Sequence, residues 1–195
     1  MVYRVWLTGY RAYELGVFQD NDPKIKVIKN VLKNALIDRL NNHSDQFWVI
    51  SGPQMGVERW GLEVAQSLKK QYPQLKTSIM EPYAQVAARW KEENQEKLAV
   101  ALNQVDFHAL VSNQPYHSPQ QLRNYQDFML KHTDELLTVF DVDRETESEQ
   151  TSKPFWDYQA AIKFQQKHNY EVMTIDFDEL QDKAQELAEQ ASADY

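Results

Sequence analysis

Residues 47–58 read FWVISGPQMGVE, and this stretch indicates the fold of the chain. Four apolar residues are followed by Ser51-Gly52, the pattern of a buried strand that ends in a turn. A helix then begins near Gly56, with an inward-facing stripe at Val57, Trp60, Val64 and Leu68. Strand, short glycine-bearing turn and helix together form the repeating unit of an α/β protein.

The same alternation continues in both directions along the chain. We expect six strands, at residues 2–7, 47–50, 75–80, 107–111, 136–140 and 172–175. Helices are expected between them. One is a long helix over residues 86–102, and the others begin at Asp22-Pro23, near Gly56, at the capping box Ser118–Gln121 and at Pro154. Right-handed crossovers then give a Rossmann-like three-layer sandwich with a mostly parallel sheet and helices on both faces. We place the first strand in the centre, between the second and the fourth.

The length of 195 residues suits one domain that covers residues 1–195. Residues 178–195 are predicted to form an acidic C-terminal helix or tail. Residues 141–153 are acidic and show no periodicity, so we expect a mobile loop there.

Composition excludes several classes of protein. The chain has no cysteine, which excludes disulfides, thiolate nucleophiles and zinc sites with cysteine ligands. The formal net charge of −8 disfavours a non-specific nucleic-acid binder, whose affinity comes largely from neutralising phosphates. No histidine pair has metal-binding spacing, so we expect no metal and no resident cofactor. A start without a signal peptide and the lack of an apolar run of ~20 residues predict a cytoplasmic protein without a membrane segment.

Glycines point to a ligand site. In an open α/β sheet, ligands bind at the carboxyl ends of the strands. Gly52 and Gly56 follow the second strand, where backbone N–H groups and a helix N-terminus can approach an anion. The alternative is that these glycines only shape a tight turn.

The first strand ends at Thr8-Gly9-Tyr10-Arg11, which we expect to face the same crevice. Thr8 offers a hydroxyl and Arg11 a forked cation for phosphate. The alternative for Arg11 is a salt bridge with Glu14. Tyr10 either stacks a base or packs in the core.

Three further positions stay open on sequence grounds. Glu58, in the first turn of the second helix, either complements the helix dipole or accepts a ribose hydroxyl, and it is the candidate acid or base of any reaction. Asp141 ends the fifth strand and either lines the site or caps the loop. Trp90, which lies close to Lys91 and Asn94, either belongs to the core or forms a platform for a ligand.

Several motifs together resemble one family. They are Thr8-Gly9-Tyr10-Arg11, Glu14-Leu15-Gly16, Ser51-Gly52, Gly56-Val57-Glu58 with Trp60, Trp90-Lys91-Glu92, Pro115-Tyr116, Ser118-Pro119, and Asp134 with Leu136-Leu137 before Phe140-Asp141. Over residues 1–176 the chain resembles the YpsA-like family of uncharacterised Gram-positive bacterial proteins. That family belongs to the Rossmann-like SLOG superfamily, which includes lysine decarboxylase-like phosphoribohydrolases and the DNA-uptake protein DprA.

The resemblance implies a nucleotide or nucleotide-sugar ligand, with Gly56 and Glu58 at its motif, and a link to cell division or stress. It also implies a homodimer, since relatives often pair. One departure limits it. The phosphoribohydrolases carry Pro-Gly-Gly-x-Gly-Thr-x-x-Glu, whereas this chain has no glycine after Gly61. The corresponding passage is 151–155, where Lys153 is a candidate phosphate contact.

Two functions remain in competition at this point. The first is a regulator or sensor that binds a phosphate-bearing nucleotide derivative above the first two strands and passes its state to a protein partner. The second is a hydrolase that acts on a nucleotide or nucleoside conjugate. The regulator is favoured because no paired catalytic carboxylates or nucleophile stand out in the sequence. A nucleic-acid-associated role is a weaker third reading.

Overall fold

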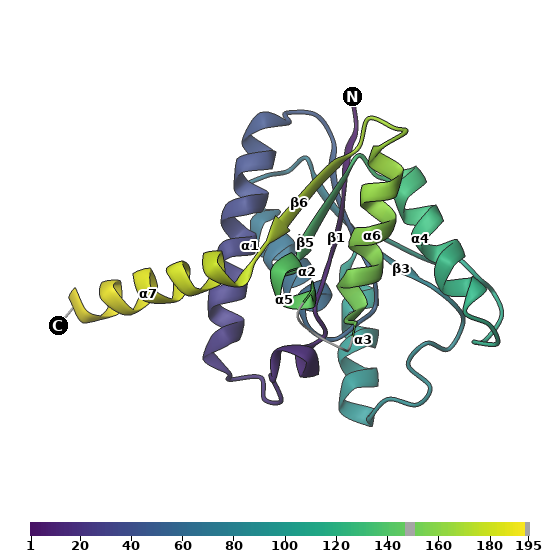
Figure 1. Ribbon diagram of the computed structural model, residues 1–195, viewed down its shortest axis with the longest axis horizontal. Helices are drawn as coiled ribbons and strands as arrows, with labels where there is room; N and C mark the ends of the chain where they lie inside the picture. The colour runs from purple at the N-terminus through teal and green to yellow at the C-terminus, as the bar shows by residue number, and fades with distance from the viewer. Residues whose placement is uncertain (147–150, 194–195) are drawn as a thin grey trace.

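A computed structural model describes residues 1–146 and 151–193 of the chain. Its centre is one six-stranded sheet in which every pairing is parallel. The strands are β1 (Tyr3–Gly9), β2 (Phe47–Ser51), β3 (Leu75–Glu81), β4 (Phe107–Leu110), β5 (Glu135–Val139) and β6 (Glu171–Ile175). The predicted α/β class with a parallel sheet is confirmed (Figure 1).

The strand order is β4-β3-β2-β1-β5-β6, so the predicted neighbours of β1 were partly wrong. β1 is central, but it lies between β2 and β5, while β4 forms an edge. Three successive crossovers carry the chain outward from β1 to β4. The chain then returns across the sheet to β5, and this reversal at β1 creates the switch point at which ligands bind in such sheets.

Eight helical segments connect or follow these strands in the described residues. They are η1 (Ala12–Leu15), α1 (Pro23–Asn42), α2 (Val57–Leu68), α3 (Glu92–Gln104), α4 (Gln120–His132), α5 (Val142–Thr146), α6 (Lys153–Gln165) and α7 (Phe177–Ala193). The start of α1 follows the sequence signal, because the Asp22 carboxylate accepts a hydrogen bond from the Lys24 N–H at 2.9 Å and Pro23 is the first helical residue.

The sheet separates two apolar clusters, one on each face. Val5 and Leu7 of β1 pack with residues of α1 and α2, whereas Trp6, between them, packs with residues of α4 and α6. Alternate residues of a strand face opposite sides, so β1 contributes to both layers. The central strand is buried from Val5 to Gly9, which anchors its carboxyl end beneath the loops that follow.

Two predicted boundaries were wrong. The helix expected over residues 86–102 begins only at Glu92, because Gln85 adopts a positive φ of 59° and the Ala84 N–H donates to the Gln114 carbonyl instead. The loop expected over residues 141–153 contains the short helix α5. Residues 147–150 of that loop lie outside the described part of the chain.

Helix α7 packs against α1 with its first turns and then projects from the body of the molecule (Figure 1). It occupies the position predicted for an acidic C-terminal helix. Within residues 1–146 and 151–193, no helix has the length and apolar character needed to span a membrane.

Candidate functional site

The loops after β1 and β2 meet directly. Arg11 and Gly56 form an isolated antiparallel bridge, and the Val57 N–H donates to the Tyr10 carbonyl at 3.1 Å. Gly56 has φ 118°, and a Cβ at this position would lie 2.5 Å from the Ala12 nitrogen. The close approach of the two loops therefore requires glycine here. Because the Val57 N–H at the start of α2 donates to Tyr10, it is not free to bind an anion, which is the role that the sequence had suggested for it.

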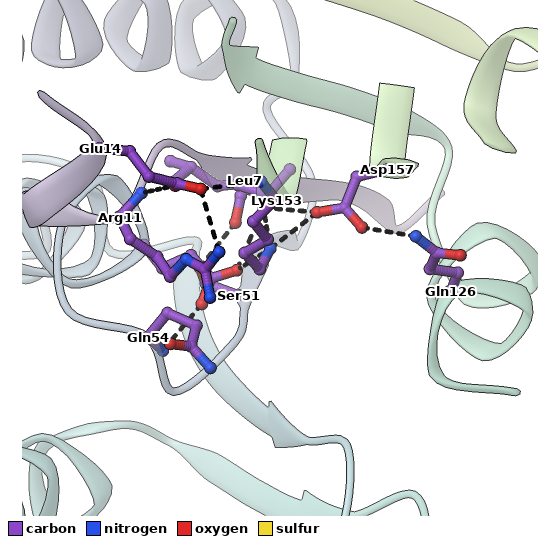
Figure 2. Close-up of polar contacts among 10 residues, drawn as sticks. Leu7, Arg11, Glu14, Ser51, Gln54, Gln126, Lys153 and Asp157 are labelled. Atoms are coloured by element: carbon purple, nitrogen blue, oxygen red, sulfur yellow. Dashed lines mark hydrogen bonds and ion pairs between the residues drawn. The ribbon is translucent and has the colours of Figure 1, made fainter. Parts of the chain in front are cut away.

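Beneath these loops lies an ionic cluster, named here the floor cluster, of Thr8, Glu58, Lys153 and Asp157. The Lys153 ammonium lies 2.7 Å from the Thr8 hydroxyl oxygen, 2.7 Å from Glu58 Oε1 and 2.7 Å from Asp157 Oδ2. The Thr8 hydroxyl is within hydrogen-bond distance of both carboxylates, at 3.1 and 3.0 Å. Figure 2 shows the Lys153 side chain and its contact with Asp157.

Three elements far apart in sequence supply the floor cluster. Thr8 comes from the end of β1, and Glu58 comes from the first turn of α2. Lys153 and Asp157 lie one turn apart on α6, the spacing that places two side chains on one helix face. Two more contacts hold the outer carboxylate oxygens, since the Gln54 N–H donates to Glu58 at 2.8 Å and the Gln126 amide donates to Asp157 at 2.9 Å.

The floor cluster has an excess of negative charge. Burial alone lowers the pKa of Lys153, but the carboxylates of Asp157 and Glu58 outweigh burial and raise it, so the ammonium keeps its proton. An ammonium has three N–H donors, and the three partners above use all of them. One cation thus faces two carboxylates, and a ligand that reaches the floor meets acceptors rather than free donors.

Tyr125 lies beside the floor cluster. Burial raises the pKa of its phenol well above the usual range, with Glu58 and Asp157 adding to the effect. Its hydroxyl is buried and has no hydrogen-bond partner among the described residues. Both Tyr125 and Glu58 close over Gly52, where a Cβ would lie 2.9 Å from the phenol oxygen and 2.5 Å from Glu58 Oε2. Glycine at this turn therefore makes room for the site's polar groups.

A cavity of about 490 Å³, named here the first cavity, opens above the floor cluster. Its lining includes both floor carboxylates and Lys153, and its walls combine two cations with two large aromatic side chains, Arg11, Arg123, Tyr83 and Trp156. Trp156 keeps 57% of its surface exposed, which is high for a tryptophan on a helix that packs on a sheet.

Arg11 forms the salt bridge with Glu14 that was the alternative to a ligand contact, and it also lines the first cavity. Its Nη2 lies 3.0 Å from Glu14 Oε1, and the same carboxylate oxygen accepts from the Lys153 N–H at 3.0 Å. Desolvation of the Arg11 guanidinium lowers its pKa, but Glu14 outweighs this, so the pKa is raised and the charge is retained. Glu14 therefore joins the first loop to the start of α6.

The remaining predicted residues support the site from outside the cavities. Tyr10 is buried, its ring stacks on Phe177 with centroids 5.5 Å apart, and its hydroxyl accepts from the Asp141 N–H. Asp141 accepts from the N–H groups of Arg144 and Phe177, which corresponds to the capping alternative. Gly9 approaches Val57 closely and lets α2 pack on the end of β1.

Of the predicted residues, Arg11 and Glu58 line the first cavity, Thr8 lies in the floor cluster beneath it, and Gly52 lies against Glu58 and Tyr125. Sequence reasoning missed Asp157 and Tyr125. The available signal for Asp157 was its position four residues after Lys153 in a predicted helix. Among residues 1–146 and 151–193, no three histidine, aspartate or glutamate side chains are grouped so that they could hold a metal ion.

Comparison with known proteins gives consistent matches. Residues 5–180 match the family described as YspA SLOG (YpsA). A UPF0398 protein of Limosilactobacillus reuteri is 53% identical over 186 residues, which cover 95% of both chains. A UPF0398 protein of Levilactobacillus brevis is 49% identical over 189 residues, or 97% of this chain and 96% of its own. One of Oenococcus oeni is 47% identical over 188 residues, which cover 96% of each chain.

Proposed function

Because this chain belongs to the YspA SLOG family, we propose that it binds a phosphate-bearing nucleotide derivative in the first cavity and acts as a regulator or sensor. The observation that carries the proposal is the composition of that cavity. Two buried carboxylates share one lysine at its floor, while arginines and aromatic rings form its walls.

Each part of a nucleotide has a suitable partner in this arrangement. Ribose hydroxyls donate to acceptors, and the floor carboxylates of Glu58 and Asp157 are acceptors beside an excess negative charge. Phosphate needs forked cations, which Arg11 and Arg123 provide on the walls. The base needs a flat apolar surface, and Tyr83 and Trp156 offer rings of that kind. Phosphate is thus expected away from the floor, where the carboxylates repel it.

A regulator passes its liganded state to another protein. In the floor cluster, Lys153 and Thr8 already pair with the carboxylates of Glu58 and Asp157. The cluster therefore has a fixed geometry, and in a regulator it serves to hold a ligand in one orientation. The family resemblance suggests cell division or stress as the setting of this regulation.

A specific observation also favours a second candidate, a hydrolase acting on a nucleotide or nucleoside conjugate. A pair of neighbouring carboxylates, which the sequence did not reveal, is present in the floor cluster as Glu58 and Asp157. In such an enzyme Glu58 serves as the acid or base, and Asp157 is the second carboxylate.

Isothermal titration calorimetry with a panel of nucleoside mono- and diphosphates tests the binding proposal. We expect at least one nucleotide to bind the wild type, and Arg11→Ala to weaken its binding by roughly ten- to hundredfold, since a charge-assisted contact is worth about 1.5–3 kcal/mol. Arg89→Ala is the matched control, because Arg89 is exposed and lines neither the first cavity nor its rim. Unchanged affinity in a folded Arg11→Ala protein contradicts the proposal, as does the absence of binding to the whole panel.

Chromatography of the incubated nucleotides separates the two candidates. A regulator leaves them intact, whereas a hydrolase releases products at a rate that Glu58→Gln abolishes. Because glutamine keeps the shape of glutamate and leaves Asp157 to pair with Lys153, this variant is expected to fold.

A further inference from the structure

Glu14 connects the first loop to α6 through its carboxylate. Oε2 accepts a hydrogen bond from the Arg11 N–H at 2.6 Å, and Oε1 lies 3.0 Å from Arg11 Nη2 and 3.0 Å from the Lys153 nitrogen. Figure 2 shows the contact between Glu14 and Arg11. The Glu14 side chain is 12% exposed, so a largely buried carboxylate occupies the guanidinium that we assign to the ligand's phosphate.

This pairing leaves Arg11 incompletely satisfied. Nε of Arg11 is buried and has no hydrogen-bond partner within residues 1–146 and 151–193. A phosphate offers several acceptor oxygens to such a guanidinium and forms the paired, charge-assisted contacts that arginine favours. A phosphate with a charge of about −2 also repels a carboxylate that shares the same guanidinium. We therefore expect the phosphate and Glu14 to compete for Arg11.

A second cavity, of about 460 Å³, lies between the end of η1, helix α1 and the first turns of α7. We call it the α7 cavity. Glu14 lines it, together with two cations, Lys24 of α1 and Arg144 of α5. In the described part of the chain, the other residues that line it are uncharged. The α7 cavity therefore has an excess of positive charge, which favours the entry of a carboxylate.

Both cations lie where a carboxylate in the α7 cavity can meet them. The Lys24 ammonium donates to the Leu15 carbonyl at 3.0 Å, one residue after Glu14, and an ammonium has further donors for a second acceptor. The Arg144 guanidinium lies 4.7 Å from the centroid of the Phe177 ring, which also lines the cavity. Rotation about the side-chain bonds of Glu14 is the movement that a change of partner requires.

We propose that Glu14 is a two-position switch that ligand binding operates. Without a ligand, its carboxylate holds Arg11 and the start of α6 together. A phosphate that binds Arg11 displaces this carboxylate, which turns into the α7 cavity and pairs with Lys24 and Arg144. The inference rests on the proposed function, because it takes Arg11 as the phosphate contact, and it adds the regulation of that site.

The second position of Glu14 links the site to α7. Phe177, Leu180 and Gln181 belong to the first turns of α7 and line the α7 cavity. A carboxylate that enters the cavity changes the surroundings of the helix that projects from the body of the molecule (Figure 1). In its first position Glu14 opposes the ligand, so the switch also lowers the affinity of the site for phosphate.

Glu14→Gln tests the competition. The probes are ADP, GDP and UDP, each compared with its parent nucleoside by calorimetric titration. Glutamine keeps the size of glutamate without its charge, so we expect at least one diphosphate to bind this variant roughly tenfold more tightly than wild type. The affinity for the nucleoside is expected to be unchanged, because it has no phosphate. Equal or weaker binding of the diphosphates by folded Glu14→Gln protein overturns the switch, since Glu14 then only supports Arg11.

Lys24→Met tests where the displaced carboxylate goes. Lys24 is exposed and lines the α7 cavity but not the first cavity. We expect this substitution to weaken diphosphate binding severalfold in the wild-type background and to have no effect in the Glu14→Gln background, where no charge moves. Lys26→Met, also exposed on α1 and outside both cavities, is the control and changes neither affinity. A Lys24→Met effect that is absent from wild type, or equal in both backgrounds, overturns the move into the α7 cavity.

Failure of the switch is distinguishable from failure of the proposed function. If Arg11→Ala weakens diphosphate binding and Glu14→Gln does not strengthen it, the phosphate contact stands and the switch is wrong. If neither wild type nor Glu14→Gln binds any of the three diphosphates, the switch and the proposed function are both wrong.

Discussion

Two charged clusters lie at opposite ends of the central strand, and they differ in how their charges balance. At the carboxyl end, the floor cluster sets one lysine against two buried carboxylates. At the amino end, Arg39 of α1 pairs with one buried carboxylate, that of Glu135 on β5. Glu135 is 2% exposed, and Arg39 Nε lies 2.8 Å from its Oε2. Tyr3 donates to Glu135 and to the exposed Glu171, both at 3.2 Å. We call this second group the basal cluster.

This contrast distinguishes a structural ion pair from a candidate binding site. The basal cluster is a matched pair that fastens a helix to a strand. The floor cluster carries an unmatched negative charge and adjoins a cavity, and beside it lies Tyr125, whose buried hydroxyl has no hydrogen-bond partner among the described residues. Such an arrangement destabilises the fold, and proteins retain unfavourable arrangements of this kind mainly at functional sites.

The largest expected effect is on the basal cluster. Arg39→Met leaves Glu135 buried without its cation, and breaking one partner of a buried pair costs about 3–5 kcal/mol. Chemical denaturation measures the loss, and nucleotide affinity is expected to be unchanged in protein that remains folded. A variant as stable as wild type shows that the basal pair does not hold α1 to β5.

Lys153→Met is expected to cost less at pH 7, near the lower end of the same range of about 3–5 kcal/mol, although two carboxylates lose their cation. The cavity that Glu58 and Asp157 line admits water, which reduces the cost of leaving them without a cation. Denaturation of this variant beside Arg39→Met decides the order. A larger loss for Lys153→Met reverses the comparison between the two clusters.

The raised pKa of Lys153 gives the stability of the wild type a defined pH dependence on the alkaline side. Its contribution is full below the ordinary lysine pKa of about 10.4 and is lost only as pH rises through the raised value. Denaturation at pH 7 and pH 9 should therefore give the same gap between wild type and Lys153→Met. A gap that closes by pH 9 contradicts the assignment of a raised pKa.

The smallest effects concern one hydroxyl at each end of β1. Tyr3→Phe removes a donor to two glutamates and is expected to cost about 1 kcal/mol. Tyr125→Phe removes a hydroxyl that has no partner in the described residues, so stability should change by less than about 0.5 kcal/mol. Thermal denaturation of the two variants side by side measures the contrast. Equal losses would show that the Tyr125 hydroxyl makes a stabilising hydrogen bond.

The fold was largely predictable because burial on both faces leaves a clear pattern of apolar strands. The order of the strands was not, since nothing in the residues of β4 and β5 marks which one returns to β1. The late start of α3 was not predictable either, because neither the positive φ of Gln85 nor the hydrogen bond from the Ala84 N–H to the distant Gln114 carbonyl leaves a local pattern.

The site was predictable only where it lies in the first two loops. Thr8, Arg11, Gly52 and Glu58 follow strands whose ends must converge in any parallel sheet. Asp157 joins them because α6 crosses over β1, a consequence of the strand order that had been predicted incorrectly. Tyr10 had two readings, and its neighbour Phe177, far along the chain, favoured packing.

The strand order also has a consequence for how the chain is made. β1 is synthesised first, but one of its two edges pairs with β5, which starts at residue 135. That edge has no partner until most of the chain has left the ribosome, and contacts between residues so distant in sequence form slowly. Glu58 likewise has no cation to pair with until Lys153 has been synthesised. The negative charge of the candidate site is therefore not balanced while the earlier part of the chain emerges.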